Sequence, residues 1–179
     1  MSRPTPEEIA SAWAREIPGA PTESILLITP LWRVAKLLED ERRRVLASLG
    51  VDAGTLDLLS TLRRAGTPFT LTTREITSRA LITAGAVSQR VARAERHGLV
   101  TRASSIASRR AVAVTLTDAG SDLVANTVRA LLAHERGLIA DLTEPEKKRL
   151  RRLLRTWETT LIEVRQPVAE VASDIHSPS

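Results

Sequence analysis

The residues that do most to determine the structure are Thr83-Ala-Gly-Ala-Val-Ser-Gln-Arg-Val-Ala-Arg-Ala-Glu-Arg-His-Gly98. At about 100° per residue, Val87, Val91 and Ala94 share one side of a helix, which predicts a narrow packed seam. The other side carries small, amide and cationic residues: Gly85, Ser88, Gln89, Ala92, Arg93 and Arg96. Small side chains let a helix approach base edges, and Gln and Arg carry forked donors that match purines in the major groove. We interpret this stretch as a DNA recognition helix, although such a pattern taken alone is more often a solvated amphipathic helix.

A short helix is predicted just before it. Thr72-Thr-Arg-Glu75 has the spacing of a reciprocal cap, which predicts a helix from about residue 73 to residue 79. A tight turn then leads to Thr83, so the two helices form a helix-turn-helix. Arg90 lies on the flank of the apolar seam, about 60° from Val87, and its guanidinium is expected to point into a cleft beside the helix.

A β-hairpin, or wing, is predicted after Gly98. Residues 99–102 and 111–116 are short β-type runs, and the serine- and arginine-rich residues 104–110 form the tip between them. Together with the helix-turn-helix, this hairpin completes the predicted DNA-contacting set: Thr72, Thr83, Gly85, Ser88, Gln89, Arg93, Arg96, Arg109 and Arg110.

Further helices are predicted on both sides of this module. They cover residues 6–17, 22–49, 52–62, 117–140 and 143–164, and Pro30 is expected to bend or restart the second of them. The long outer helices carry more apolar face than one small module can bury, which favours a symmetric homodimer. Two-fold symmetry would present two recognition helices to successive turns of the major groove, which implies a palindromic site.

The expected fold is mainly α with a small β-wing, a winged helix-turn-helix flanked by dimerisation helices. We divide the chain into four segments. Residues 1–50 hold an extra N-terminal helix and a dimerisation helix, 51–116 the winged module, 117–165 the C-terminal dimerisation helices and 166–179 a disordered tail.

Positive charge is concentrated on the winged module. Residues 72–116 contain eight arginines and two acidic residues, a net charge of +6 in a chain whose total is +5. Such a local field suits phosphate neutralisation. Aromatic residues are only 2% of the chain, too few for the stacking platforms of single-strand and RNA binders, so duplex DNA is the expected partner.

Other sequence features narrow the class of protein. The chain has no cysteine, and neither His97 nor His134 belongs to a metal-binding pattern, so no metal or other cofactor is expected. The N-terminus does not resemble a signal peptide, and no apolar run is long enough to span a membrane, which predicts a cytoplasmic protein without a membrane partner. The sequence motifs of common hydrolases, phosphate-binding loops and metalloproteases are absent, so an enzyme is not expected.

Three short motifs resemble the MarR family of bacterial transcriptional regulators. They are Leu99-Val-Thr-Arg, Arg109-Arg110-Ala and Leu116-Thr-Asp-Ala-Gly120, and the resemblance covers about residues 22 to 164. It implies a dimeric winged helix-turn-helix repressor that leaves DNA when a small ligand binds between its dimerisation and DNA-binding parts. The family usually has Asp two residues before the wing arginine, whereas this chain has Ser108, so Arg110 lacks its usual carboxylate partner.

The chain is also similar to the urate-responsive subfamily, which adds an N-terminal helix and uses Trp, Asp and two Arg residues in its ligand cleft. The resemblance places these roles on Trp13, Asp57, Arg90 and Arg102 and implies urate as the effector. An arginine fork and an indole suit a flat anion rich in acceptors.

Each of these ligand residues has an ordinary alternative. Trp13 can anchor its helix, Asp57 can be a solvated helix charge and Arg102 can contact a phosphate. Two alternatives to the urate regulator also stay open. One is a MarR-type regulator of a different phenolic or anionic metabolite, and the other is a winged-helix module that binds proteins.

Overall fold

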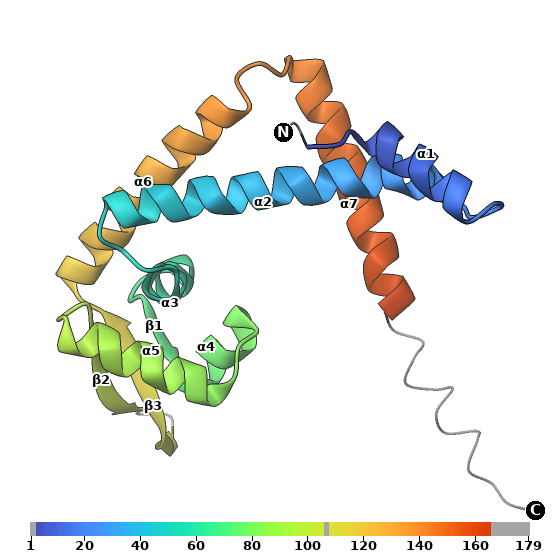
Figure 1. Ribbon diagram of the computed structural model, residues 1–179. Helices are drawn as coiled ribbons and strands as arrows, with labels where there is room; N and C mark the ends of the chain where they lie inside the picture. Colours follow the sequence, from blue (N-terminus) through green and yellow to red (C-terminus); the bar gives the residue numbers. More distant parts are fainter. Residues whose placement is uncertain (1–2, 106–107, 166–179) are drawn as a thin grey trace, which may run out of the picture. The chain divides into compact units, whose positions relative to one another are not determined.

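The computed structural model describes residues 3–105 and 108–165, and for residues 104, 105, 108–111 and 165 it describes the backbone alone. The predicted tail 166–179 lies outside the described residues. The described residues form two compact units, which divide between His134 and Glu135. Figure 1 shows the helices α1 (Pro6–Glu16), α2 (Ile25–Ser48), α3 (Ala53–Arg64), α4 (Thr73–Ala80), α5 (Ala84–Arg96), α6 (Asp118–Leu138) and α7 (Glu144–Arg165). It also shows the strands β1 (Thr70–Thr72), β2 (Val100–Ser105) and β3 (Ser108–Leu116). A 3-10 turn, η1 (Thr22–Ser24), comes directly before α2.

The wing belongs to an antiparallel sheet with the strand order β1-β3-β2. The sequence did not predict β1, because three residues are too few to show an alternating pattern; this strand pairs Leu71 with Val114. The two wing strands are also longer than predicted, since β2 reaches Ser105 and β3 begins at Ser108. Arg109 and Arg110 therefore lie within a strand rather than in a loop, while their side chains lie outside what the structure describes.

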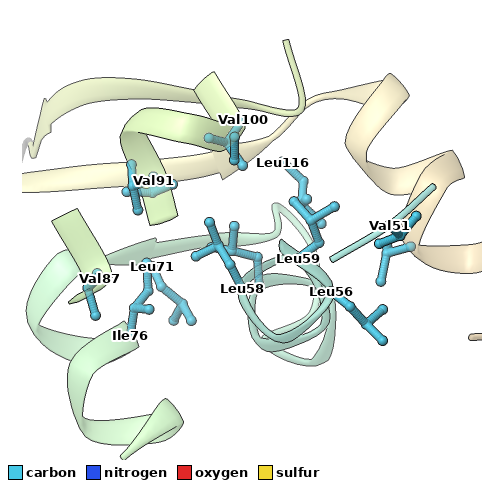
Figure 2. Packing of buried hydrophobic residues seen from close by; sticks show 14 of the residues in the cluster. Val51, Leu56, Leu58, Leu59, Leu71, Ile76, Val87, Val91, Val100 and Leu116 are labelled. Atoms are coloured by element: carbon cyan, nitrogen blue, oxygen red, sulfur yellow. The ribbon is translucent and has the colours of Figure 1, made fainter. Parts of the chain in front are cut away.

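The core of the winged module is built around α3. Its side chains Leu56, Leu58, Leu59 and Leu62 are all buried. Figure 2 shows how residues of the neighbouring helices and strands gather around them: Leu71, Ile76, Val87, Val91, Val100 and Leu116. Burial of this many aliphatic side chains, at about 1.5–3 kcal/mol for each, gives the module a core of its own.

Side-chain caps set the ends of the helix-turn-helix. Thr72 and Glu75 form the predicted capping box, in which the Glu75 backbone N donates to the Thr72 hydroxyl and the Thr72 backbone N donates to the Glu75 carboxylate. Thr83 caps α5 by accepting from the Ala86 N at 3.2 Å. Between the helices, Leu81 has the left-handed conformation, φ 52°, that makes the turn tight. The predicted seam of α5 is confirmed, because Val87, Val91 and Ala94 are at most 1% exposed.

Gly120 lets the start of α6 pack against the wing. A Cβ atom at this position would lie well inside van der Waals contact with the Leu99 carbonyl oxygen, which belongs to the backbone and cannot rotate away. Thr117 joins the same elements, since its hydroxyl donates to the Gly98 oxygen at 2.7 Å and accepts from the Gly120 N at 3.0 Å. The motif Leu116-Thr-Asp-Ala-Gly120 therefore fixes how α6 leaves the sheet.

The helices α1 and α2 lie together in the first unit. Arg33 of α2 donates to the Pro4 oxygen at 2.6 Å, just before α1 begins. Pro30 was expected to bend the second helix or restart it; α2 runs through Pro30 without a break, so the helix does not restart there. Pro30 is the sixth residue of α2, and the helix lacks the one backbone hydrogen bond that an N–H at this position would donate to the Leu26 oxygen.

In the second unit, the Thr143 backbone N and hydroxyl both donate to the Glu146 carboxylate at the start of α7. Among the described residues, no single helix is long and apolar enough to cross a membrane. The pair Thr22–Ser48 and Ala53–Arg64, which is bent by 88°, passes a test of length and composition, but α3 lies in the core of the module.

Candidate DNA interface and ligand cleft

The outer face of α5 is open to solvent. Gly85, Ser88, Gln89, Arg93 and Arg96 are all exposed, opposite the buried seam. A Cβ atom added at Gly85 would meet no other atom within 4 Å, so no other part of the described chain packs against the first turn of α5 at this position. Such a face has the shape and the donors to enter a major groove.

The two predicted threonines have their hydroxyls engaged at helix starts. Thr72 is half-buried and its hydroxyl donates to Glu75 at 2.7 Å, while Thr83 is exposed and its hydroxyl accepts from the Ala86 N. Helix N-termini attract phosphate through their free N–H groups and the helix dipole. Both hydroxyls therefore act in helix caps, and contact of Thr72 and Thr83 with DNA stays a prediction.

Arg93 is held by a carboxylate of the module. Its Nη2 lies 3.5 Å from Oδ2 of Asp52, the residue that caps α3. Burial, the largest single influence, acts to raise the pKa of Asp52, but hydrogen bonds from Thr55 and the charge of Arg93 outweigh it and hold the pKa below its usual value. Arg93 can thus orient α5 against α3 as well as reach DNA.

Arg90 is the predicted cleft residue, and it lies over α3. Its Nη1 is 3.4 Å from Oδ2 of Asp57, and its side chain is 29% exposed. Gly54, one turn before Asp57, leaves room for it, because a Cβ atom there would lie 3.2 Å from the Arg90 Nε. Asp57 also lies near a second cation, since the Arg42 Nη2 of α2 is 3.8 Å from its Oδ1.

Arg102 joins the wing to the recognition helix. Near the start of β2, its guanidinium forms an ion pair with Glu95 of α5. The hydrogen bond from Arg102 is the main reason why the pKa of Glu95 is lowered, and the same bond raises the pKa of Arg102. This pair is therefore a direct contact between the wing and α5.

The structure brings together two of the four predicted ligand residues. Asp57 and Arg90 form an ion pair. Within the described part of the chain, no hydrogen bond or ion pair connects Trp13 or Arg102 to them, and Trp13 is half-exposed on α1. The ligand role of all four stays a prediction.

Arg42, Glu95 and the pairing of Asp52 with Arg93 were not predicted from the sequence. The sequence predicted a helix over residues 52–62 from a local pattern, but an ion pair from Asp52 to another helix is not visible in such a pattern. Arg42 and Asp57 are on helices that meet only after folding. The ion pairs around α5 therefore could not be predicted from the spacing of residues in the sequence.

Two cavities adjoin α3. One of about 250 Å³ is lined by Asp52, Thr55, Arg93, His97 and apolar residues of neighbouring elements. The other, of about 310 Å³, lies between α3 and α6 and is lined by Ser60, Arg63, Arg64, Val124, Ala125, Val128 and Arg129. In the described residues, no group of His, Asp or Glu has the arrangement of a metal site.

Comparison with known proteins identifies the family. The sequence pattern of the MarR family matches residues 49–111. The HTH-type transcriptional regulator PecS of Dickeya dadantii (strain 3937) is 31% identical over 155 residues, which are 87% of this chain and 93% of PecS.

Solved structures of other regulators have a similar fold. Sco3205, a MarR family transcriptional regulator from Streptomyces coelicolor in complex with DNA, has a TM-score of 0.63 and 28% identity, over 79% of this chain and 93% of Sco3205. BpsR of Bordetella bronchiseptica, whose DNA binding is regulated by 6-hydroxynicotinic acid, has a TM-score of 0.61 and 21% identity, over 74% of this chain and 92% of BpsR. The chain belongs to the MarR family, and it is a DNA-binding transcriptional regulator rather than an enzyme.

Proposed function

We propose that the chain is a cytoplasmic, homodimeric repressor that binds a palindromic operator and leaves it when a small anion, urate, binds beside α5. The observation that carries this proposal is the position of Arg90. It belongs to the same helix as the exposed residues Ser88 and Gln89, yet its guanidinium pairs with Asp57 of α3. A ligand that binds Arg90 therefore acts on the helix that contacts DNA.

The ion pair is weak enough to be exchanged. Asp57 is 48% exposed and 3.4 Å from Arg90, and exposed pairs contribute only about 0–1 kcal/mol. Urate is a flat anion with several acceptor atoms, and a guanidinium fork binds such groups with two parallel hydrogen bonds. Urate can therefore compete with Asp57 for Arg90.

The switch requires different affinities for two forms of the protein. Urate would hold Arg90 on α5 and Arg102 on the wing, with Trp13 over the cleft, in a form whose two recognition helices no longer match the groove spacing. A ligand shifts the equilibrium only by its differential affinity for the two forms. The Arg102–Glu95 pair supports this coupling, because it already links the wing to α5.

The exposed apolar faces of the long helices support the dimer. On α2, Leu27, Trp32 and Leu37 are each at least 60% exposed. On α7, Leu153 and Leu161 are half-exposed. Apolar helix faces of this size are typical of interfaces between subunits, and a two-fold axis would pair two α5 helices on one operator.

DNA recognition is tested by competition binding with an operator duplex and random duplexes. Affinity should fall steeply with salt, since arginines displace counterions. Gln89→Ala and Arg93→Ala should relax the preference for the operator, while Arg110→Ala should lower affinity for all duplexes. Arg43→Ala on α2 is the matched control and should change neither. Equal affinity of the wild type for all duplexes would overturn sequence-specific binding.

The effector is tested by titrating urate into the preformed DNA complex. Trp13→Phe and Arg102→Ala should keep most of the DNA affinity but need far more urate for release. Trp157→Phe in α7 and Arg43→Ala are matched controls and should release at the wild-type concentration. If millimolar urate does not dissociate the wild-type complex, urate is not the effector; if both cleft variants respond like the wild type, the effector binds elsewhere.

The cavity between α3 and α6 supports a second candidate effector. Arg63, Arg64 and Arg129 surround an apolar floor of Val124 and Val128, which suits an anion with an apolar body, such as a phenolic acid. In this alternative, Arg64→Ala would abolish the thermal stabilisation caused by 4-hydroxyphenylacetate, while Arg90→Ala would not. If Arg90→Ala abolishes the thermal stabilisation caused by urate while Arg64→Ala does not, the result favours the first candidate.

A further inference from the structure

Asp57 is shared by two arginines from different helices. Its Oδ2 lies 3.4 Å from Arg90 of α5, and its Oδ1 lies 3.8 Å from Arg42 of α2. Each carboxylate oxygen therefore faces its own guanidinium. A single side chain of α3 links the recognition helix to the helix with the exposed apolar face.

Arg42 differs from the two arginines that follow it. Arg43 pairs with Glu39 and Asp40, and Arg44 pairs with Glu41, all within α2. Among the ion pairs of the described residues, Arg42 has its partner on another helix instead. The side chain of Arg42 is thus directed to Asp57 of α3, whereas Arg43 and Arg44 pair along their own helix.

The charges of this group are unbalanced. Arg42, Arg90 and Asp57 together carry a net charge of +1, and their side chains are 43%, 29% and 48% exposed. Solvent and small solutes can reach the group, while its partial burial makes the excess charge more effective than in bulk water. A monoanion with acceptor atoms on two edges would neutralise it and bind both forks.

We infer that Arg42 is a further ligand-cleft residue, which supplies the second guanidinium for the anion and links the bound anion to α2. This inference rests on the proposed function. When the anion enters, it takes the place of the Asp57 carboxylate between Arg42 and Arg90. The ligand then joins α5 directly to α2, so that a change at the cleft reaches the helix that we propose for the dimer interface.

The test measures urate binding to the DNA-free protein by calorimetry near neutral pH and constant ionic strength. Arg42→Ala and Arg42→Gln should each weaken urate binding by about 10-fold or more, since a hydrogen bond between charged groups is lost. Arg43→Ala, which removes the same charge one residue away, should bind urate within about 3-fold of the wild type. Arg42→Lys should fall between, because it keeps the charge but loses the fork.

A neutral purine distinguishes a role of Arg42 in binding the anion from a purely structural role. Hypoxanthine has a similar ring system but no negative charge, so Arg42→Ala should weaken urate binding more than hypoxanthine binding and reduce the ratio of the two affinities. A merely structural role of Arg42 would weaken both equally and leave the ratio unchanged. That outcome, or wild-type urate affinity in Arg42→Ala, would overturn the inference and leave the proposed function standing. If the wild type itself does not bind urate, the proposed effector is wrong and the inference falls with it.

Discussion

The winged module and the long outer helices bury their apolar residues to very different degrees. In the module, Leu59, Leu62 and Val87 are fully buried, and each comes from a helix that packs against others in the same unit. On α2, Trp32 is 70% exposed, and on α7, Val164 is 65% exposed. Both regions are rich in aliphatic side chains, yet only one of them has its packing partners within the described chain.

This difference distinguishes the region whose apolar residues are buried within one chain from the helices whose apolar residues need a second chain to cover them. The module has a closed core and capped helices within one chain, so its packing contacts do not require another molecule. The outer helices gain from burial only if another surface covers them. Substitutions in the module should therefore change folding, and substitutions on the outer helices should change assembly.

Gly120→Ala should have the largest effect, because it breaks the module. The added Cβ would collide with the Leu99 backbone oxygen, so either α6 or β2 must move. Overpacking of this kind costs about 1–3 kcal/mol in the free energy of unfolding. Denaturant unfolding measures it. Gly137→Ala in the same helix is the control, since a Cβ there meets nothing, and it should be neutral or stabilising by up to about 1 kcal/mol. Equal stabilities of the two variants would contradict the close packing of α6 on the wing.

Leu161→Lys in α7 should change assembly instead. Leu161 is half-exposed, so a charge there costs the isolated chain little but would be buried in a dimer interface. We expect a monomer in sedimentation at micromolar concentration, weaker operator binding and an unchanged circular dichroism spectrum. Thr159→Lys adds the same charge at a nearby exposed position and tests for a general charge effect. A Leu161→Lys protein that sediments as the wild type does would place the interface elsewhere.

Acid should weaken the module through the cap of α4. Bonds from the Thr72 backbone, then from its hydroxyl, lower the pKa of Glu75 below its ordinary value of 4.5. Because the pKa is depressed in the folded state, the stabilisation is present above that ordinary value and is lost as the pH falls through the folded one. Thermal melts should therefore show little pH dependence from Glu75 between about pH 6 and 8, where its stabilisation is fully present, and a loss of that stabilisation below about pH 4.5. Glu75→Gln should remove that acid-dependent part, whereas Glu144→Gln, at an exposed position in α7, should not.

Much of the fold could be predicted from the sequence because its signals are local. The capping box at Thr72, the helix start at Thr83 and the seam of Val87 and Val91 depend on residues close in sequence, and the structure confirms them. The strand β1 could not be predicted, because its three residues become a strand only by pairing with β3. The lengths of β2 and β3 likewise depend on pairing between residues that are apart in the sequence.

The candidate site was predictable in part for the same reason. The flank position of Arg90 follows from helix periodicity, and the structure pairs its guanidinium with Asp57 of α3, while the cleft beside it stays a prediction. Arg42 could not be found, since three consecutive arginines look alike in sequence and only the crossing of α2 and α3 separates them. The contact between Arg102 and Glu95 also depends on how the wing returns to α5.

Gly54→Ala should have the smallest effect on stability and a clear effect on the switch. An alanine in the first turn of α3 restricts the unfolded chain and should stabilise the module by a few tenths of a kcal/mol, up to about 1. Its Cβ would lie 3.2 Å from the Arg90 Nε and 3.2 Å from the Asp52 Oδ1, but both atoms belong to side chains, which can move by a few tenths of an ångström where the Leu99 backbone at Gly120 cannot.

The cost of Gly54→Ala therefore appears as a displaced guanidinium rather than as unfolding. We expect an equal or higher melting temperature together with a several-fold rise in the urate concentration that releases DNA, since a shift of the guanidinium weakens paired hydrogen bonds. Gly85→Ala on the open face of α5 is the matched glycine control: it should gain similar helix stability, keep the wild-type urate response of the protein and change only its affinity for DNA. If Gly54→Ala keeps the wild-type urate response, the stem of Arg90 does not need the space on α3. If it lowers the melting temperature as Gly120→Ala is expected to, Arg90 is fixed as firmly as the core, and the cleft cannot be the adjustable part of the molecule.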